Sequence, residues 1–271
     1  MPIESVSPSR VLRGVVTGCA FGYAGLCLLG HLGYRALLYP APEADDVAPP
    51  AGARLVELRA SDGVAVHAME FANAAAARTV VYFHGNGEVI GDDVWMAQRL
   101  VAQGFAVSLV EYRGYGRSRG TTPNEDGLYA DASAVLDDLA ARGTGADRVV
   151  LWGASLGSGV AAEIARRGRG AALVLVTPYT SISDMAALRA PLLPARWLVD
   201  DRFDTLAKAA SLHVPTVVVH GTDDEVIPFA MGERVAAAIP GSHFERVKGG
   251  HHADCFLTDD SLLARVAKVA R

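Results

Sequence analysis

Hydrophobic residues follow two different patterns along the chain, and the pattern changes near residue 40. Residues 14–34 contain no Asp, Glu, Lys or Arg. An apolar stretch of this length matches the ~20 residues with which a helix crosses the hydrocarbon of a bilayer. After Tyr39 comes PAPEADDVAPPAG, whose prolines cannot continue a helix. The pattern therefore predicts a membrane anchor helix over residues 1–38 and a Pro-rich tether over residues 39–53.

Beyond the tether, short apolar runs alternate with helix-like segments. The runs typical of strands are RLVELRA, GVAVHAMEFA, RTVVYFHG, FAVSLVEYRG, RVVLWG, AALVLVTP, HVPTVVVHG and HFERVKG. The first two flank a turn at residues 61–63 and predict an antiparallel hairpin. Helices are expected over residues 88–103, over 121–143, after Ser155 and over SLLARVAKVA. Residues 54–271 are thus predicted to form an α/β domain with eight mostly parallel strands and helices on both faces.

Residues 181–210 break this alternation. They read SISDMAALRAPLLPARWLVDDRFDTLAKAA, with two prolines, one tryptophan and several leucines. Open α/β sheets bind ligands at the carboxyl edge of their strands. We therefore expect a small apolar cap over that edge that forms one wall of a pocket, with an ordinary irregular connection as the alternative.

Charges around the apolar N-terminal stretch predict its orientation. Arg10 and Arg13 precede the stretch and Arg35 alone follows it closely. By the positive-inside rule the N-terminus lies in the cytoplasm and the main domain on the outer, periplasmic or extracellular, side. A cleaved signal peptide and a helix packed on the domain are the alternatives. Glycines at every fourth position predict a flat helix face for self-association, formed by Gly14, Gly18 and Gly22.

Composition narrows the classes of partner. The chain has 271 residues, a net charge of -5 and 51% hydrophobic residues. Its Lys and Arg residues are scattered singly, so we expect no nucleic-acid partner. The three cysteines form no CxxC pair, and we predict neither a metal nor a cofactor. Cys255 lies near two histidines but is expected to be a buried thiol.

A G-x-S-x-G motif carries the candidate nucleophile. Residues 153–157 read GASLG, after the expected strand RVVLW and before a helix of small residues. Such a strand-to-helix turn is strained and presents the serine hydroxyl at the top of the sheet. The glycines are needed because neighbouring backbone passes too close for a Cβ atom. We therefore predict that Ser155 is a nucleophile.

A nucleophilic serine needs a base and an acid, which in this fold follow it in the order acid, then histidine. HGTDDEVIP follows the strand HVPTVVV, and we choose Asp224 over its neighbours Asp223 and Glu225. The base is expected in GGHHADCF after the strand HFERV. Counted without a gap from Gly249, His252 is the histidine of the common G-x-x-H-x-D form of this loop. A one-residue gap would select His251 instead.

Hydrolysis also needs N–H donors for a developing oxyanion. HGNG at residues 84–87 ends the strand RTVVYF. We expect the backbone N–H groups of Asn86 and of Leu156, the residue after the nucleophile, to converge on one point. His84 is expected to be a buried, hydrogen-bonded support.

Five segments, taken in order, resemble the α/β-hydrolase superfamily: HGNG, EYRGYGRS, WGASLG, HGTDDEVIP and GGHHAD. LLYPAP, DGVAVHA and WLVDDRFDTLAKA resemble its anchored serine-hydrolase branch, which includes abhydrolase-domain depalmitoylases and bacterial relatives. The resemblance implies a triad of Ser155, Asp224 and His252, and acyl-ester or thioester hydrolysis without a cofactor. Glu111 stands where the family usually has Asp, and Ala253 where Asn is common.

The sequence therefore predicts an anchored serine hydrolase that acts through an acyl-enzyme on a small-molecule or lipid-like acyl substrate. A serine peptidase on the same fold would share this machinery and differ in its pocket. A binding protein without catalysis is the other alternative, since a fold does not guarantee activity.

Overall fold

The computed structural model describes residues 8–42, 48–255 and 260–270, so residues 1–7 of the predicted anchor and 43–47 of the predicted tether lie outside the described part. Its sheet has eight strands in the order β1-β2-β4-β3-β5-β6-β7-β8. β2 pairs antiparallel with β1 and β4, and all other neighbours are parallel. This confirms the predicted fold. The strands are β1 (Ala53–Arg59), β2 (Ala65–Phe71), β3 (Thr79–Phe83), β4 (Ala106–Glu111), β5 (Val149–Ala154), β6 (Ala172–Val176), β7 (Thr216–Gly221) and β8 (His243–Val247).

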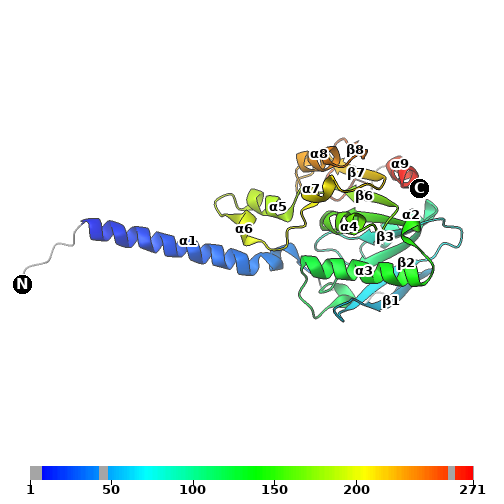
Figure 1. Cartoon of the computed structure of the whole chain (residues 1–271), viewed down its shortest axis with the longest axis horizontal. Helices are drawn as coiled ribbons and strands as arrows, with labels where there is room; N and C mark the ends of the chain where they lie inside the picture. Colours follow the sequence, from blue (N-terminus) through cyan, green and yellow to red (C-terminus); the bar gives the residue numbers. More distant parts are fainter. Residues whose placement is uncertain (1–7, 43–47, 256–259, 271) are drawn as a thin grey trace, which may run out of the picture.

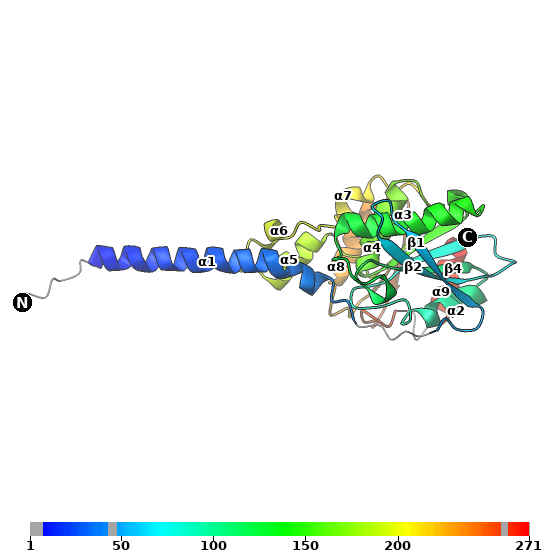
Figure 2. The ribbon, with the colours of Figure 1, turned by 90° about the horizontal axis from the view of Figure 1, so that it is seen from below.

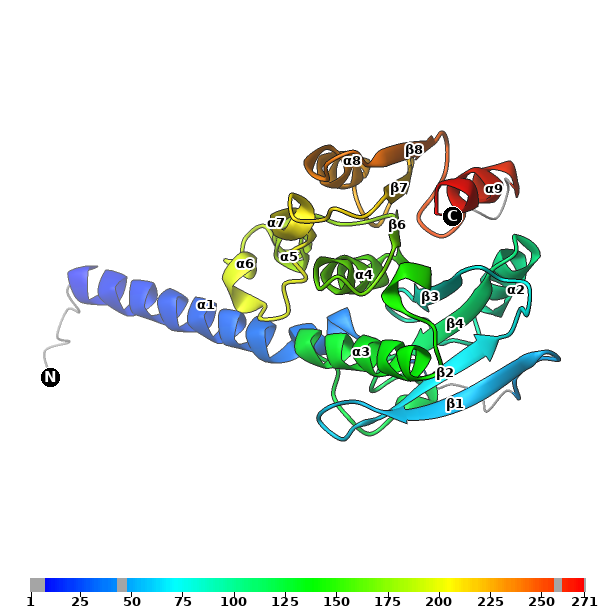
Figure 3. The same cartoon turned by 45° about the vertical axis from the view of Figure 1, so that its right-hand side comes forward.

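Helices cover both faces of the sheet (Figure 3). One face carries α3 (Glu125–Ala141), α4 (Leu156–Arg166) and α8 (Phe229–Ala238), whose buried side chains share one core cluster with the sheet. The other face carries α2 (Val94–Ala102) and α9 (Asp260–Val269) with a second cluster. Two short 3-10 turns, η1 (Gly116–Ser118) and η2 (Ala146–Arg148), complete the connections.

Three helices differ from the sequence prediction, the first being α3, which spans Glu125–Ala141 rather than residues 121–143 because the Asn124 side chain caps it. α2 begins at Val94 rather than at residue 88. The preceding residues form turns in which side chains bond the backbone: Glu88 accepts the N–H of Gly85 at 2.6 Å and Asp92 that of Val89 at 3.0 Å. Such local bonds compete with a helix. α8 was not assigned from the sequence, where FAMGERVAAA gives a weak signal.

Residues 181–210, the cap, form three short helices at the carboxyl edge of the sheet: α5 (Ile182–Arg189), α6 (Ala195–Leu198) and α7 (Thr205–Ala209). Ser181 precedes α5 as a regular N-cap, because its hydroxyl accepts the N–H of Asp184 at 3.0 Å. In Figures 1 and 2, α5 and α6 lie beyond the sheet, beside the C-terminal half of the N-terminal helix.

The N-terminal helix α1 (Pro8–Leu38) projects away from the domain (Figure 1). Its segment Leu12–Leu38 has a mean hydropathy of 1.6 and is long and apolar enough to cross a bilayer, a test that a signal sequence also passes. Its C-terminal half contacts the cap: the Tyr23 hydroxyl donates to the Leu192 carbonyl at 3.0 Å. No described atom lies within 4 Å of a Cβ built on the predicted self-association face, the glycines Gly14, Gly18 and Gly22. That face stays a prediction.

Candidate active site

Ser155 occupies the sharp turn between β5 and α4. Its backbone has φ 48° and ψ -116°, a region that non-glycine residues adopt only under strain. The turn is held because the Ser155 N–H donates to the Val176 carbonyl of β6 at 3.0 Å. A Cβ at Gly153 would lie 2.2 Å from the Gly157 carbonyl oxygen, and one at Gly157 would lie 2.1 Å from that of Phe83. Both glycines of the motif are therefore required by close backbone approach.

His252 lies in the loop after β8, against Ser155. Its Nε2 is 3.0 Å from the Ser155 hydroxyl oxygen, and its Nδ1 is 2.9 Å from the Asp224 carboxylate. A proton on Nδ1 satisfies the carboxylate and leaves Nε2 free to accept from the hydroxyl. His251 lies elsewhere: its side chain is 58% exposed and pairs with Glu225 at 3.2 Å. Of the two histidines that the sequence left open, the structure brings only His252 to Ser155.

Asp224 is held in the loop after β7 by four hydrogen bonds. Its Oδ1 accepts the N–H groups of Val226 and Ile227 at 2.9 and 2.8 Å, and its side chain is 0% exposed. Burial alone would raise the pKa of this carboxyl, but the hydrogen bonds from His220, His252 and the Ile227 N–H lower it below its usual value. Asp224 is therefore an anion that orients the imidazole beside it.

His220 is a supporting residue that the sequence analysis did not assign. It is the fifth residue of β7 and is fully buried. Its Nε2 lies 3.1 Å from the Ile227 carbonyl and 3.2 Å from the Asp224 carboxylate, so this nitrogen carries the proton. His220 thus clamps the turn that carries the acid. The sequence places His220 four residues before Asp224. That spacing brings the two side chains into contact only if the loop after β7 turns back on the strand, which the sequence alone does not show.

The HGNG loop runs beside the serine. A Cβ at Gly85 would lie 3.4 Å from the Ser155 Cβ, and the Gly85 N–H is taken by the Glu88 carboxylate at 2.6 Å. Two other amides lie near Ser155 and could act as oxyanion donors. The HGNG loop offers the N–H of Asn86, and the first turn of α4 offers the N–H of Leu156. Helix N–H groups in the first turn have no acceptor inside the helix.

Two groups support this loop, the buried His84 and the half-buried Glu88. The His84 side chain is 1% exposed and its Nδ1 donates to the Gly85 carbonyl at 2.7 Å; burial lowers the pKa of His84 to about 4, so the ring is neutral. Burial raises the pKa of Glu88. Glu88 was missed from the sequence because a carboxylate after HGNG usually just faces solvent. Glu111, the departure from the usual Asp, is structural: it accepts the N–H groups of Ile90 and Arg117 at 3.1 and 2.9 Å.

A pocket of about 430 Å³ leads away from Ser155, within the range of small-molecule sites. Its walls come from the catalytic loops, from the cap and, unexpectedly, from α1. Arg189 is the only charged side chain among the described residues that line it. The lining residues are Gly30, Tyr34, Leu37 and Leu38 of α1; Asn86, Ser155, Leu156, Tyr179, Val226 and Ile227; and Ile182, Met185, Ala186, Arg189, Ala190, Leu193, Ala195, Leu198 and Val199 of the cap.

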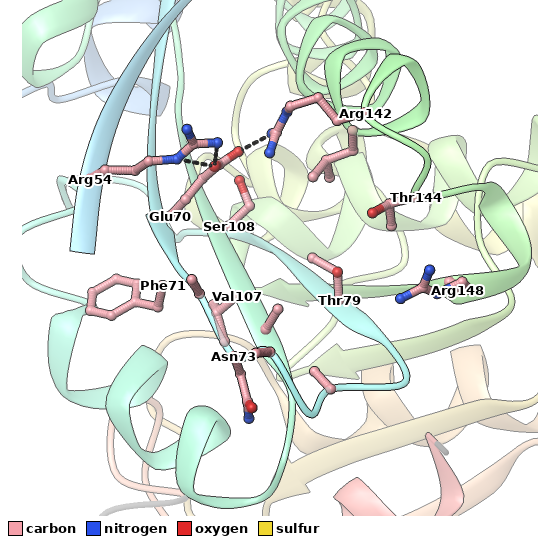
Figure 4. Close-up of a pocket in the computed structure, with 15 residues that line it drawn as sticks. Arg54, Glu70, Phe71, Asn73, Thr79, Val107, Ser108, Arg142, Thr144 and Arg148 are labelled. Atoms are coloured by element: carbon pink, nitrogen blue, oxygen red, sulfur yellow. Dashed lines mark hydrogen bonds and ion pairs between the residues drawn. The ribbon is translucent and has the colours of Figure 1, made fainter. Parts of the chain in front are cut away.

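A second cavity, of about 340 Å³, lies at the opposite edge of the sheet (Figure 4). None of the predicted catalytic residues lines it. Two of its three arginines, Arg54 and Arg142, are engaged by the Glu70 carboxylate.

The described residues contain no group of three or more His, Cys, Asp or Glu side chains placed to hold a metal. Burial raises the pKa of Cys255 to about 12, so this thiol is no nucleophile at neutral pH.

The sequence and fold were compared with known proteins. A family described as "Serine aminopeptidase, S33" matches residues 74–207. An uncharacterized protein of Mycobacterium tuberculosis is 34% identical over 239 residues, 84% of each chain. The alpha/beta hydrolase domain-containing protein WAV2 of Arabidopsis thaliana is 31% identical over 74% of this chain and 72% of its own. Lysophosphatidylserine lipase ABHD12 of Macaca fascicularis is 32% identical over 66% of this chain and 50% of its own.

A solved structure shares the fold. The solved esterase Pf2001 of Pyrococcus furiosus superposes with a TM-score of 0.70 at 18% identity, covering 84% of this chain and 95% of its own. With its eight-stranded sheet and its serine at a strand-to-helix turn, the chain belongs to the α/β-hydrolase superfamily. The predicted superfamily is confirmed, and with it a hydrolase.

Proposed function

We propose that the chain is a serine hydrolase that cleaves carboxylic ester or thioester bonds of acyl substrates. The observation that carries the proposal is the hydrogen-bonded chain from the Ser155 hydroxyl through His252 to Asp224, with spacings of 3.0 and 2.9 Å. A serine hydroxyl is a weak nucleophile until a base accepts its proton, and a carboxylate keeps that base in the right tautomer.

In the proposed reaction the Ser155 oxygen attacks the acyl carbonyl carbon as its proton moves to His252 Nε2. The Asp224 anion stabilises the imidazolium that forms. The carbonyl oxygen becomes an oxyanion, for which the N–H groups of Asn86 and Leu156 are the proposed donors. Collapse breaks the ester or thioester bond, and the leaving alkoxide or thiolate takes the proton from His252. A water molecule then repeats these steps on the acyl-enzyme and releases the acid.

The substrate is proposed to carry an extended acyl chain. The pocket beside Ser155 is lined mostly by Leu, Ile, Val, Ala and Met side chains, and such a surface gains free energy by removing alkyl groups from water, about 0.8 kcal/mol for each methylene buried. The relative named lysophosphatidylserine lipase supports a lipid-like substrate. The acid released would be a fatty acid or another long alkyl acid.

A serine aminopeptidase is the second candidate, since the matching family carries that description. An aminopeptidase must bind the free, positively charged amine of its substrate. A carboxylate near the scissile bond would do this. The only charged residue among the described residues lining the pocket is the cation Arg189, which repels an ammonium group. The esterase is therefore the function that the pocket favours.

A fluorophosphonate probe tests the hydrolase proposal. We expect it to label the wild-type chain covalently and to leave Ser155→Ala unlabelled. Labelling that persists in Ser155→Ala would place the nucleophile at another residue, and no labelling of a folded wild-type chain would favour a binding protein without catalysis. Rates on p-nitrophenyl esters of rising chain length, set against aminoacyl p-nitroanilides, separate the esterase from the aminopeptidase. Faster turnover of the anilides would reverse the assignment.

We also propose that α1 anchors the chain in a membrane, with its N-terminus in the cytoplasm and the catalytic domain outside. The length and hydropathy of Leu12–Leu38 support an anchor. Protein made in its host should stay in the membrane pellet after carbonate extraction. Protease added to intact cells stripped of their outer layers should digest the catalytic domain. Release by carbonate contradicts the anchor, and protection from protease contradicts the orientation.

A further inference from the structure

The cap presents large apolar side chains to the outside. The side chains of Leu192 and Trp197 are 87% and 80% exposed, and that of Leu188 is 54% exposed. Single exposed apolar residues are common on soluble proteins, whereas clusters mark an interaction surface. These three lie on α5, on α6 and on the turn between them, the part of the cap that runs alongside α1 (Figures 1 and 2). We call them the cap edge.

The part of the cap that carries the cap edge is tied to α1 between Tyr23 and Arg35. The Tyr23 hydroxyl donates to the Leu192 carbonyl at 3.0 Å, and the His31 ring lies 2.9 Å from the Leu198 carbonyl. Arg35 bonds Asp201 at 2.8 Å. From Tyr23 to Arg35 the helix rises about 18 Å at about 1.5 Å per residue, whereas the hydrocarbon core of a bilayer is about 30 Å thick. With α1 across a bilayer, these bonds hold the cap edge at the depth of the adjoining leaflet.

Several backbone polar groups beside the cap edge are satisfied within the protein. Irregular backbone in hydrocarbon must have its polar groups satisfied. The turn between α5 and α6 contains Pro191 and Pro194, which have no N–H to satisfy. The Leu193 N–H donates to the Ala190 carbonyl at 3.0 Å. The carbonyls of Leu192 and Leu198 are paired with the Tyr23 hydroxyl and the His31 ring of α1.

Two arginines neighbour the cap edge in the sequence, and each has a partner within the protein. Arg196 pairs with Asp184 in the first turn of α5 at 2.9 Å. Arg189 donates to the carbonyl of Val226, in the loop that carries the acid, at 2.9 Å. Long basic side chains at membrane surfaces take this arrangement, with the apolar stem in lipid and the charged head toward water.

We propose that the cap edge is embedded in the lipid leaflet beside α1 and that the acyl pocket takes its substrate directly from that leaflet. The pocket reaches Gly30 of α1 and Leu193 and Leu198 of the cap, so its outer end lies between α1 and the cap edge. A lipid acyl chain entering there passes from hydrocarbon to the apolar pocket without crossing water. The inference rests on the anchored hydrolase proposed above and names a bilayer lipid as the source of its acyl group.

Tryptophan fluorescence of the full chain in lipid nanodiscs tests the position of the cap edge without using activity. The chain has three tryptophans, so the signal of Trp197 is the difference between wild type and Trp197→Phe. Lipids brominated in their acyl chains should quench this signal, and aqueous iodide should not. Quenching by iodide alone would place the cap edge in water. Protection from both quenchers would mean that protein, such as a second copy of the chain, covers it. Either result overturns the proposal.

Substrate presentation gives the second test. Leu192→Glu and Trp197→Glu should lower kcat/KM about tenfold on a long-chain ester embedded in vesicles, because a charge in hydrocarbon is costly. Hydrolysis of a short water-soluble ester should be unchanged. Val269→Glu is the matched control, since Val269 is 42% exposed on α9 at the far end of the molecule (Figure 1). It should leave both rates unchanged.

The outcomes separate this inference from the proposed function. Equal losses on both substrates would make the cap edge a structural element, and no loss on vesicles would remove it from the lipid path. Both results overturn the inference while fluorophosphonate labelling of Ser155 stays intact. Loss of that labelling in the wild-type chain would instead overturn the hydrolase, and release by carbonate would overturn the anchor.

Discussion

The two walls of the pocket beside Ser155 are built in different ways. On one wall Ser155, Asp224 and His252 follow the ends of β5, β7 and β8, and hydrogen bonds fix each of them. The opposite wall consists of short cap helices and the end of α1, joined by a few contacts such as that between Tyr23 and Leu192. The proposed chemistry is thus attached to the sheet, while the surface proposed to meet an acyl chain is attached to segments at its edge.

This difference predicts two kinds of mutational effect. Changes on the sheet side should alter the rate of bond cleavage for every substrate. Changes on the cap and α1 side should alter which acyl chain is accepted and leave the chemistry intact. Variants that mix the two effects would show that the walls are not independent.

The largest effect is expected for the base. His252→Ala should lower kcat about a million-fold, because Ser155 then has no proton acceptor within reach. His251→Ala is the matched control, since the His251 side chain is exposed and pairs with Glu225. It should change kcat by no more than about twofold, as surface pairs contribute little. Initial rates on a p-nitrophenyl ester decide, and a large loss in His251→Ala would exchange the roles of the two histidines.

The acid comes next. Asp224→Asn keeps the shape of the side chain but removes the charge that selects the His252 tautomer, so kcat should fall about a thousand-fold or more. Burial would raise the pKa of Asp224, but hydrogen bonds from His220 and His252 hold it below its usual value. A lowered pKa in the folded chain means that the unfolded chain takes up a proton first as the pH falls. The stabilisation is therefore complete above about pH 4 and is lost as the pH falls through the folded pKa.

Thermal unfolding measures this stabilisation directly. Asp224→Asn should unfold at a lower temperature than the wild type at pH 7, and the difference should shrink below about pH 4. Glu225→Gln, at an exposed neighbour, is the control and should leave Tm unchanged. A Tm difference that is constant from pH 3 to pH 7 would show that the charge of Asp224 contributes nothing to stability.

The oxyanion donors should have a smaller effect. Because the proposed donor at residue 86 is the backbone N–H, Asn86→Ala should retain most of the activity, whereas Asn86→Pro, which has no N–H, should lose about a hundred-fold in kcat. Circular dichroism checks that the proline variant is folded. Equal losses in the two variants would mean that the Asn86 side chain, or no group of this residue, stabilises the oxyanion.

What the sequence could predict follows the same division between the walls. The strands could be predicted because each is a local apolar run, and the turn at Ser155 because its two glycines and its flanking strand and helix are adjacent in the sequence. Spacing favoured His252 but left His251 open, since a loop can absorb one residue. The structure separates the two by which imidazole lies against Ser155.

The contacts that the sequence could not predict join distant segments. His31 and Leu198 are 167 residues apart, and no local pattern reports that α1 forms a wall of the pocket. His220 was missed because its contact with Asp224 depends on how the loop after β7 turns back. Glu88 was missed because only burial distinguishes it from an ordinary solvent-facing carboxylate. Apolar pattern and motif spacing thus predict the sheet side better than the cap side.

The smallest effect, and the one confined to the cap side, concerns a glycine of α1. A Cβ at Gly30 would lie 3.7 Å from a Leu198 methyl carbon and 3.9 Å from one of Leu193, so Gly30→Phe should direct a ring into the outer end of the pocket. We expect kcat/KM for long-chain esters to fall about tenfold, equivalent to about 1.4 kcal/mol of lost binding. Short-chain esters, which do not reach this end, should be hydrolysed as before.

Gly33→Phe provides the control on the same helix. Gly33 is exposed, and no described atom lies within 4 Å of a Cβ built there, so the added ring should face away from the pocket. Both variants carry the same change in helix propensity and apolar surface, and only one of them obstructs the acyl chain. Equal profiles of rate against chain length in the two variants would mean that α1 forms no wall of the pocket during turnover. A shift of the preferred chain length in Gly30→Phe alone would assign chain-length selection to the helix.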